Sequence, residues 1–573
     1  MALSTRLYMV LAIRLANAFL LRTFFQPDEY FQCLEPAWRL AFGPQSHAWL
    51  TWEWKHRLRS SIHPALFSAA YLAADKLAGW TSCRTTALMA APRLLQAVIA
   101  ALGDVYTAKL AALIYGSHSA AALTALCLQL FSPWQWYVST RTFSNSLETS
   151  LTVMALYFWP WQLVMGGGVS VKENSRQPSL QLQLSRLRAS LCLAALAVVL
   201  RPTNVLIWVT IAAVSATRIA PSSLLVLVRE TIVCGALVLA LSLVSDRLYF
   251  GVWTLPAVNW LNFNISKSLA VFYGRNPWHY YLVQGIPLLC TTSLPFVLWG
   301  LYSPAASSRQ QANTLKCLVY AVAVTVTILS LISHKEVRFI YPLLPMLNVV
   351  AAPRVASFLA SPLSQSKASS PRIRNTSFLA TALVINVVVA AYLSILHQPA
   401  PLSVMSFLRS EYERTHPSAA LAPSSNPSSS SDDLFALFLT PCHSTPWRSH
   451  LVHPHLTAYA LSCEPPLHTA PNSPERANYR DQADRFYDDP DAFLRLELVP
   501  SLAARSPRYV VGFEGIEPLL HDFATSREAK EWGVSRVDRV WTGFNGFFNE
   551  DWRRRGSMVV WDLGARDDNQ TRI

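Results

Sequence analysis

Long apolar segments separated by short polar loops make up the first two thirds of the chain. Residues 7–25 form the first of them, and they are long enough to cross a bilayer core, which needs roughly 20 residues. This segment lacks the cleavage signature of a removed signal peptide, so residues 1–25 are predicted to hold a retained first transmembrane helix. Further apolar blocks bring the expected total to about ten to thirteen crossings. They lie at 64–79, 87–115, 119–138, 147–165, 189–217, 221–250, 280–301, 315–333, 338–360 and 377–396.

Two of these blocks carry residues that are unusual inside a membrane. Block 87–115 contains Asp104, and block 189–217 is interrupted by Arg201-Pro202-Thr203-Asn204. The interruption suggests a break between two short crossings. An intramembrane acid needs a partner, so Asp104 is expected either to pair with one of the arginines at the span boundaries or to line a polar cavity.

The composition is typical of a multispanning membrane protein, because 52% of the 573 residues are hydrophobic and only 14% are charged. Much of the net charge of +14 is spread over short loops, which positive-inside bias explains better than nucleic-acid binding. One topology places all three of the basic loops in the cytosol; these are 166–188, 302–316 and 361–376. The same topology sends the 26–63 loop, the 251–279 loop and the C-terminal region to the lumenal side. Residues 64–396 then form the multispanning transmembrane domain.

The chain changes character after His397. Residues 397–573 mix polar and apolar positions, and the Pro/Ser-rich segment at 417–431 is typical of a flexible linker. Alternating segments at 509–513 and 557–561 predict short strands. We therefore expect a small lumenal α/β or α+β domain at the C-terminus.

The cysteines and the glycines give little support for a cofactor site. Most of the nine cysteines fall in apolar spans, where a thiol behaves as a small hydrophobic group. Cys442 and Cys463 are exceptions in the predicted lumenal tail, where either a disulfide or two buried thiols is expected. There is no Cys-x-x-Cys pair, no His-Glu-x-x-His motif and no Walker or Rossmann glycine loop, so the sequence supports no metal or nucleotide site.

Adjacent carboxylates follow the first apolar segment. Asp28 and Glu29 can act as a general base, as metal ligands or as acceptors for sugar hydroxyls. Pro27-Asp28-Glu29 also suits the first turn of a helix, where carboxylates are favoured. Tryptophans and charges of both signs follow in the same loop; those singled out are Trp52, Glu53, Trp54, Arg57 and Arg59. These indoles can stack on sugar rings or sit in the membrane interface.

Cations also gather at the ends of several spans. His334, Lys335 and Arg338 lie between two apolar blocks, and Arg141 and Arg201 occupy similar positions elsewhere. Such cations can hold a lipid-linked phosphate as a leaving group, with bidentate contact from an arginine. The alternative is that they anchor the spans in the membrane.

Several motifs together resemble the family 22 glycosyltransferases. They are PDE at 27–29, TWEW at 51–54, RS at 59–60, HP at 63–64 and HKEVRF at 334–339. This resemblance implies the GT-C membrane fold and transfer of mannose from dolichyl-phosphate mannose in the lumen of the endoplasmic reticulum. Members of the family act either on the N-glycan precursor or on the glycosylphosphatidylinositol (GPI) precursor.

Other segments resemble the branch of this family that adds the third mannose, in α1,2 linkage, to the GPI precursor. They are FQPDEYFQ at 25–32, RTFSNSLET at 141–149, FYG and PWHYY within 272–281, and PCHSTP at 441–446. The sequence departs from the usual family pattern at Gln26 and Trp38, and these changes leave Asp28 and Glu29 untouched. The partners implied are the two lipid-linked substrates.

The resemblance also implies roles for individual residues. An inverting single displacement needs one base, assigned to Asp28 with Glu29 as its neighbour or substitute. The donor phosphate or lipid is assigned to His334, Lys335, Arg338, Arg201 and Arg141. The sugar or acceptor is assigned to Trp52, Glu53, Trp54, Arg57, Arg59, Trp278 and His279. The leaving group is already a phosphate, so no metal or other cofactor is expected.

Two other classes of protein share some of these features. A polytopic transporter also has intramembrane charges and broken helices, but it commonly shows a repeat between two halves, and none is visible here. A scaffold protein would not need carboxylates and cations clustered at several span boundaries on one side of the membrane. An enzyme is therefore the favoured class.

Overall fold

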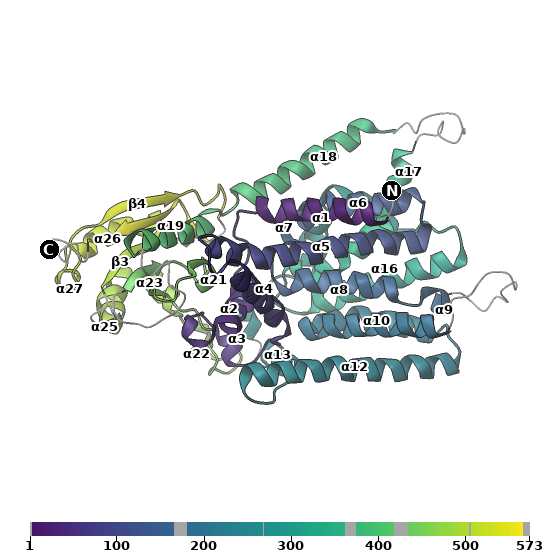
Figure 1. The fold of residues 1–573 in the computed structure, drawn as a ribbon, viewed down its shortest axis with the longest axis horizontal. Coiled ribbons are helices and arrows are strands. Elements are labelled where there is room, and N and C mark those ends of the chain that lie inside the picture. The colour runs from purple at the N-terminus through teal and green to yellow at the C-terminus, as the bar shows by residue number, and fades with distance from the viewer. Residues whose placement is uncertain are drawn as a thin grey trace.

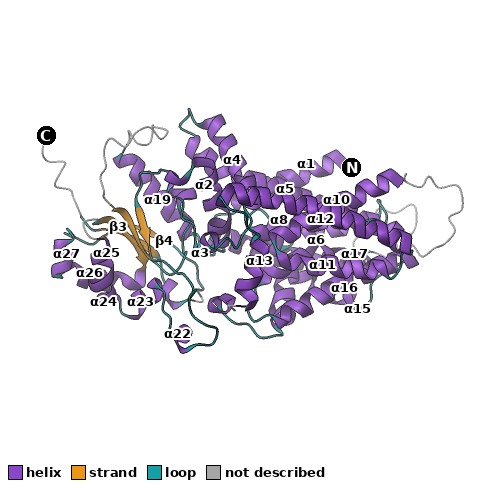
Figure 2. Ribbon diagram, turned by 90° about the horizontal axis from the view of Figure 1, so that it is seen from below, coloured by secondary structure: helices purple, strands orange, loops and turns teal. Residues whose placement is uncertain are grey.

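A helical bundle lies at one end of the protein and a small mixed sheet with short helices lies at the other (Figures 1 and 2). The Pro/Ser-rich segment predicted at 417–431 lies outside the residues that the structure describes. This computed structural model describes residues 3–165, 180–266, 269–360, 374–416, 434–502, 506–549 and 551–564.

The bundle consists of long apolar helices that run side by side (Figure 1). α8 is its central helix, since it packs against both α5 and α10. α18 runs at an angle to the others and buries none of its residues. The long helices are α1 (Leu3–Leu20), α5 (Arg84–Tyr115), α6 (Ala120–Leu130), α8 (Ser144–Phe158), α10 (Leu180–Leu200), α11 (Val205–Ala216), α12 (Pro221–Phe250), α15 (Leu294–Tyr302), α16 (Arg309–Leu331), α17 (Leu344–Leu359) and α18 (Thr376–Ala391).

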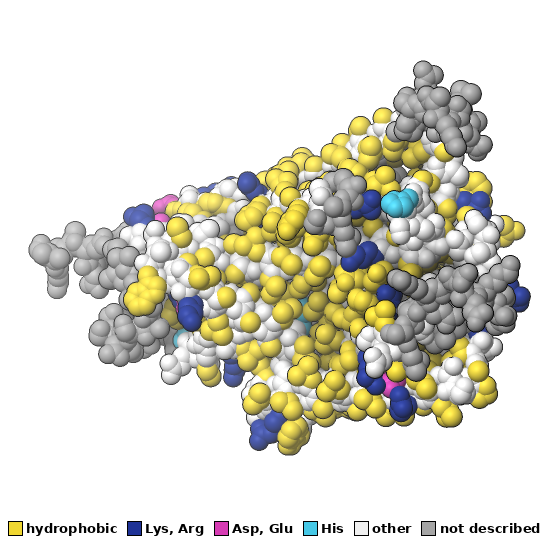
Figure 3. Space-filling model, turned by 45° about the vertical axis from the view of Figure 1, so that its right-hand side comes forward, with side chains coloured by type: hydrophobic (Ala, Val, Ile, Leu, Met, Phe, Trp, Pro, Cys, Tyr) yellow, Lys and Arg dark blue, Asp and Glu magenta, His cyan; other side chains and the backbone are white. Residues whose placement is uncertain are grey.

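Seven helices in the described part of the chain are long and apolar enough to cross a membrane. The sequence predicted ten to thirteen crossings. Part of the difference comes from α6, α8 and α11, which lie in the same bundle but contain only 11, 15 and 12 residues. Hydrophobic side chains cover much of the bundle face shown in Figure 3, as expected of a surface that contacts lipid. The protein is a multi-pass membrane protein.

The predicted break at Arg201 is confirmed. α10 ends at Leu200, a short 3₁₀ turn follows at Pro202–Asn204, and α11 continues from Val205. Proline lacks the N–H group that would continue the hydrogen-bond ladder of a helix. The chain therefore changes direction here, and Arg201 occupies the corner.

Shorter helices connect the bundle to the sheet domain. Glu35 on α2 joins two distant segments, because its carboxylate accepts hydrogen bonds from the backbone N–H groups of Trp49 and Ser449 at 3.0 and 2.8 Å. The connecting helices are α2 (Glu35–Phe42), α3 (Trp52–Lys55), α4 (Ile62–Ala78) and α13 (Pro256–Leu261); α7 (Pro133–Val138), α9 (Trp161–Met165) and α14 (Ile286–Cys290) are short helices of the bundle itself.

A buried ion pair joins α1 to α5. Arg14 Nε lies 2.6 Å from Asp104 Oδ2, and neither side chain is exposed. Asn17 and Gln135 complete the network, because Arg14 donates to Asn17 and Gln135 donates to Asp104 at 2.8 Å. Asp104 thus has the structural role that we expected as one alternative, but its partner is an arginine of the first helix and not one of the boundary arginines.

We expect the substitution Asp104→Asn to lower the free energy of unfolding by about 3–5 kcal/mol, because it leaves the charge of Arg14 buried and uncompensated. Unfolding of the purified protein in detergent, followed by circular dichroism, measures this loss. The double variant Arg14→Met with Asp104→Leu should recover most of it, since no buried charge remains. An Asp104→Asn protein as stable as the wild type would contradict this account.

The C-terminal domain is built on a five-stranded mixed sheet in the order β2-β1-β3-β5-β4. β1 pairs in parallel with β2 and β3, whereas β5 pairs antiparallel with β3 and β4. The strands predicted at 509–513 and 557–561 correspond to β3 and β5 and are confirmed. The strands are β1 (Leu434–Leu439), β2 (Ala458–Ala460), β3 (Pro507–Phe513), β4 (Asp538–Gly543) and β5 (Met558–Asp562).

The helices of this domain cover both faces of the sheet. One face packs on α19 and shares a hydrophobic core with Phe24, Tyr30 and Trp38 of the first loop. The domain is therefore continuous with the segment that carries Asp28. Its helices are α19 (Ala400–Thr415), α21 (Arg448–Leu451), α22 (Pro474–Ala477), α23 (Gln482–Asp488), α24 (Pro490–Ala492), α25 (Val499–Leu502), α26 (Glu517–Ala524) and α27 (Arg527–Glu531).

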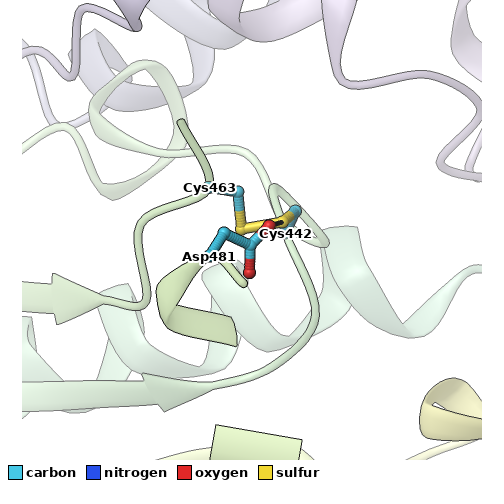
Figure 4. Close-up of side chains that lie close together, drawn as sticks. All are labelled: Cys442, Cys463 and Asp481. Carbon is cyan, nitrogen blue, oxygen red and sulfur yellow. Dashed lines mark hydrogen bonds between the residues drawn. A yellow bond between two sulfur atoms is a disulfide. The ribbon is translucent and has the colours of Figure 1, made fainter. Parts of the chain in front are cut away.

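Cys442 and Cys463 form a disulfide, with Cα atoms 5.6 Å apart (Figure 4). Asp481 lies beside it, and its Oδ1 atom caps α23 by accepting a hydrogen bond from the N–H of Asp484. These three side chains are close enough for a metal site. Because the two sulfur atoms are bonded to each other, the cluster offers a cation only one carboxylate.

Candidate active site

Three segments that are far apart in the sequence meet where the bundle faces the sheet domain. The first follows α1 and carries Asp28. The second is the turn at His334–Glu336 together with the 3₁₀ segment Val337–Leu343 that follows it. Arg338 lies in the first turn of this 3₁₀ segment. The third is the corner at Arg201. α2, α3 and α13 lie in the same region of the molecule (Figure 1).

Asp28 and Arg338 form the central ion pair of this region. The Arg338 guanidinium also donates two hydrogen bonds to Glu336, at 2.7 and 2.6 Å. Burial alone would raise the pKa of Glu336, but the charge of Arg338 and hydrogen bonds from His334 and Arg338 hold it well below its ordinary value. Glu336 therefore stays ionised at neutral pH. Arg338 is fixed between two carboxylates, and Asp28 keeps part of its side chain, 17%, exposed.

Glu29 lies in a different environment from its neighbour. Its carboxylate pairs with Arg141 at 3.0 Å, and both side chains are almost fully buried. Arg141 also donates to the carbonyl oxygens of Thr23 and Tyr137. The sequence assigned Glu29 to catalysis and Arg141 to the donor phosphate or lipid. In the structure they pair with each other, so they hold the segment after α1 against the turn after α7, and the catalytic assignment rests on Asp28 alone.

Arg201 is buried and makes no direct ion pair with any described residue. Only 7% of the residue is exposed, and within the described parts of the chain its guanidinium makes no hydrogen bond and no ion pair. It lies against the ring of Phe339, 5.3 Å from the centroid, and Arg338 lies 5.7 Å from the same centroid. Arg59 and Arg338 repel it electrostatically, whereas Glu148 and Asp28 attract it without direct contact. Of these three guanidinium groups, Arg338 and Arg59 are already paired with carboxylates, so Arg201 is the one that a phosphate could bind without displacing a partner.

Glu148 is a buried acid whose charge acts on Arg201, and its carboxylate already accepts hydrogen bonds from two asparagines. Asn204 donates to it at 2.8 Å, and Asn145 donates both to Glu148 and to the carbonyl oxygen of Arg338. Asn204 also donates to Thr152 and accepts from the indole of Trp208. This network positions the backbone on both sides of the guanidinium cluster.

Lys335 and His334 hold a neighbouring loop in place. Lys335 Nζ donates to the carbonyl oxygen of Asn276 at 2.9 Å, and the side chain of Asn276 donates back to the carbonyl oxygen of Lys335. His334 contacts the carbonyl oxygen of Gly274 through Nδ1 and Glu336 through Nε2, both at 3.1 Å. Lys335 is 3% exposed. Its role here is structural, which differs from the phosphate contact expected from the sequence.

The loop after α2 supplies a polar and aromatic wall. The indole of Trp52 donates to the hydroxyl of Tyr273 at 2.9 Å, and Glu53 pairs with Arg59 at 3.1 Å. Trp54 corrects our expectation, because it is 2% exposed and its indole donates to the carbonyl oxygen of Phe31. Trp54 is therefore a core residue that no sugar can reach.

The remaining residues predicted for the acceptor lie at the surface. Arg57 is exposed and follows α3. Trp278 and His279 are also exposed, and their rings contact each other edge to face at 5.5 Å. The loop that carries them is the one that Lys335 holds.

Sequence reasoning missed several residues of this region. Asn145 and Glu148 lie within the RTFSNSLET segment, and Asn204 closes the Arg-Pro-Thr-Asn interruption, so both motifs carried a signal. Glu336 lies inside the HKEVRF motif, yet nothing in the sequence marked it as the partner of Arg338. Tyr273 belongs to the FYG segment, and its contact with Trp52 spans more than 200 residues of sequence.

A family model supplies the decisive comparison. The model described as the Alg9-like mannosyltransferase family matches residues 5–452, which contain the three segments of the candidate site but only β1 of the sheet. The chain belongs to the Alg9-like mannosyltransferase family. It is accordingly a membrane-embedded mannosyltransferase, and lipid-linked substrates are characteristic of this family.

Similar proteins extend over nearly the whole mannosyltransferase. It is 59% identical to "GPI mannosyltransferase 3" of Gibberella zeae, over 98% of this chain and 95% of the relative. It is 44% identical to the protein of the same name from Aspergillus fumigatus, over 98% of this chain and 78% of the relative. It is 35% identical to "GPI alpha-1,2-mannosyltransferase 3" of Mus musculus, over 96% of this chain and 88% of the relative.

A solved structure shows the same fold. ArnT from Cupriavidus metallidurans, bound to undecaprenyl phosphate, aligns with a TM-score of 0.55 over 97% of both chains, at 13% sequence identity. At this identity the likeness concerns the fold alone. The mannosyltransferase has the GT-C architecture expected from the sequence, with a helical membrane bundle and a small sheet domain.

Proposed function

We propose that this mannosyltransferase transfers the third mannose, in α1,2 linkage, from dolichyl-phosphate mannose to a GPI precursor that carries two mannoses. The names of its relatives support the acceptor and the linkage. The observation that carries the donor is the buried Arg201, which converges with Arg338 and Arg59 beside Asp28. Burying an arginine that makes no direct ion pair is costly, and the phosphate of a lipid-linked sugar would supply one.

The proposed reaction is a single inverting displacement. The donor is β-linked and the product is α-linked, so the acceptor oxygen attacks the anomeric carbon from the side opposite the phosphate. The bond between the anomeric carbon and the phosphate oxygen breaks as the new glycosidic bond forms. Asp28 takes the proton of the acceptor 2-hydroxyl. The electron pair leaves with dolichyl phosphate, whose charge Arg338 and Arg201 stabilise.

The acceptor sugar would enter along the loop after α2. Glu53 and Arg59 offer hydrogen bonds for sugar hydroxyls, and Trp52, which is only 8% exposed, positions the hydroxyl of Tyr273 through its indole. Trp278 and His279 lie on the loop held by Lys335 and would contact the outer part of the acceptor. Glu336 keeps Arg338 oriented, so its part in the reaction is one of positioning.

We place the active site in the lumen of the endoplasmic reticulum. α9 and α17, the described helices that lead into the basic loops 166–188 and 361–376, lie toward the end of the bundle opposite the sheet domain (Figure 1), and the positive-inside rule assigns that end to the cytosol. The sheet domain contains the Cys442–Cys463 disulfide, and disulfides persist in oxidising compartments such as this lumen.

We expect transfer to continue without a divalent metal, because guanidinium groups take the place that a cation would occupy at the leaving phosphate. Adding an excess of EDTA to the purified enzyme with both lipid substrates should leave the rate unchanged. A rate that collapses in EDTA and returns with Mg²⁺ or Mn²⁺ would show that a metal binds the phosphate instead.

A microsomal assay tests the proposed function. Microsomes from cells that lack their own third mannosyltransferase receive this protein, dolichyl-phosphate mannose, and either a GPI precursor with two mannoses or an N-glycan precursor. We expect a third mannose on the GPI precursor that an α1,2-specific mannosidase removes. Transfer only to the N-glycan precursor would overturn the acceptor while keeping the donor.

A further inference from the structure

A cavity of about 280 Å³ opens beside the active site on the α3 and α13 side. It is lined by Lys55, His56, Arg57, Asn259, Asn262 and Phe263. Two of these residues are cations with flexible stems, one is a histidine, and Asn262 adds an amide, whereas the amide of Asn259 already donates to Arg57 and Thr254; no acid is among them. Such a lining suits an anion with several oxygen acceptors.

The backbone of Arg57 is held in an unusual conformation. Its φ angle is +57°, in the left-handed region that side chains with a Cβ rarely occupy. Asn259 of α13 fixes this conformation by donating to the carbonyl oxygen of Arg57 at 3.1 Å. Among the described residues the guanidinium of Arg57 has no ion-pair partner. Strain of this kind tends to persist where a side chain has to be presented to a ligand.

Lys55 adds a second positive charge. It pairs with Glu464 at 2.6 Å, but the side chains are 62% and 44% exposed. An exposed pair of this kind contributes little stability. Lys55 is therefore able to exchange this partner for a stronger anion.

The position of the cavity connects it both to the site and to the membrane. Phe263 in its wall lies 6.0 Å from the ring of Trp52, which in turn bonds to Tyr273 at the active site. On the other side, α13 exposes Val258 and Leu261 and follows Trp253, which is 68% exposed at the end of α12. Exposed tryptophan and aliphatic side chains at the end of a span are typical of the headgroup level of a bilayer.

We propose that this cavity binds the phosphodiester of the lipid-linked acceptor. The inference rests on the proposed function, in which Arg201 and Arg338 already hold the donor phosphate, so a second basic site needs a second anion. An acceptor anchored in the bilayer keeps its phosphodiester at headgroup level while its terminal mannose reaches Asp28. The cavity lies between these two places, and it would set the distance between the anchor and the reacting sugar.

Steady-state kinetics of the purified enzyme in nanodiscs test this proposal. Arg57→Gln is expected to raise KM for the acceptor about tenfold, because one charge-assisted hydrogen bond to the acceptor is lost. The values of kcat and of KM for the donor should change little. Arg57→Lys should restore most of the acceptor affinity, because it keeps the charge. Adding Lys55→Gln to Arg57→Gln should raise acceptor KM further. Arg555→Gln, an exposed arginine of the sheet domain, is the matched control.

Each outcome decides for or against the site. If acceptor KM is unchanged in Arg57→Gln and in the double variant with Lys55→Gln, while the wild type transfers mannose normally, the phosphodiester site is overturned and the proposed function stays intact. Failure of the wild type to use the GPI precursor would overturn the function itself. Nanodiscs with and without anionic phospholipid distinguish the acceptor phosphodiester from the headgroup of a bulk lipid as the bound anion. If the variants turn over more slowly than the wild type only when anionic phospholipid is present, and their acceptor KM is unchanged, the cavity binds the membrane lipid and the proposal is contradicted.

Discussion

Replacing Arg201 with glutamine is expected to lower kcat by roughly 10²–10³-fold while leaving the thermal unfolding temperature unchanged or higher. The arginine is buried, is repelled by Arg59 and Arg338 and attracted by Glu148 and Asp28, and makes no direct ion pair among the described residues. Its removal relieves the folded protein of a buried charge that no direct ion pair compensates. The same removal deprives the departing phosphate of a pre-oriented donor, and such donors are worth a factor of this size. Turnover and thermal unfolding, measured on the same preparation, check both halves of the prediction.

Arg14 provides the matched control for this experiment. It is also a buried arginine of the bundle, but it is paired with Asp104 at 2.6 Å. Arg14→Gln should therefore lower the unfolding temperature, the reverse of the pattern expected at position 201. An Arg201→Gln protein that unfolds more easily but keeps its turnover would assign Arg201 to structure and remove it from the phosphate site.

The second large effect is expected at Asp28. Asp28→Asn should reduce kcat by roughly 10²–10⁴-fold, the usual contribution of a general base, because an amide cannot take the proton of the acceptor hydroxyl. Asp28→Glu should retain part of the activity, since it keeps a carboxylate but displaces it. Initial rates with both lipid substrates at saturation report the loss.

A carboxylate far from the site controls for the charge change. Asp75 on α4 pairs with Arg84 at 2.6 Å, and both side chains are about one third exposed. Asp75→Asn should keep nearly full activity. If Asp28→Asn were equally active at matched protein levels, the chemistry would have to be assigned to another base.

The elements of the fold followed from local patterns. Apolar runs of sufficient length predicted the spans, the proline after Arg201 marked a corner, and alternation at 509–513 and 557–561 predicted β3 and β5. Each of these signals depends on residues close together in the sequence. Whether helices such as α6 and α11 cross the membrane was harder to predict from the sequence. Each is too short to span the bilayer alone, but it can still pack inside the bundle against longer neighbouring helices.

The pairing of the charges did not follow from the sequence. Asp104 is 90 residues from Arg14, and Glu29 is 112 residues from Arg141. No periodicity connects residues at such separations, so the sequence indicated that partners were needed without saying which. The same limit explains Trp54, because its contact with Phe31 places it in the core. The structure brings Asp28, Arg201 and Arg338 of the predicted site close together, but which of the predicted residues pair with one another could be seen only from the coordinates.

The most direct test of the central claim is the affinity of the purified protein for dolichyl phosphate, the leaving group of the proposed reaction. We compare the wild type with Arg201→Gln and Asp28→Asn, by scintillation proximity binding of labelled lipid. The account predicts that Arg201→Gln weakens binding at least tenfold and that Asp28→Asn binds as tightly as the wild type or more tightly, because Arg338 is freed from its carboxylate partner. Unchanged affinity in Arg201→Gln, or affinity lost only in Asp28→Asn, would contradict it.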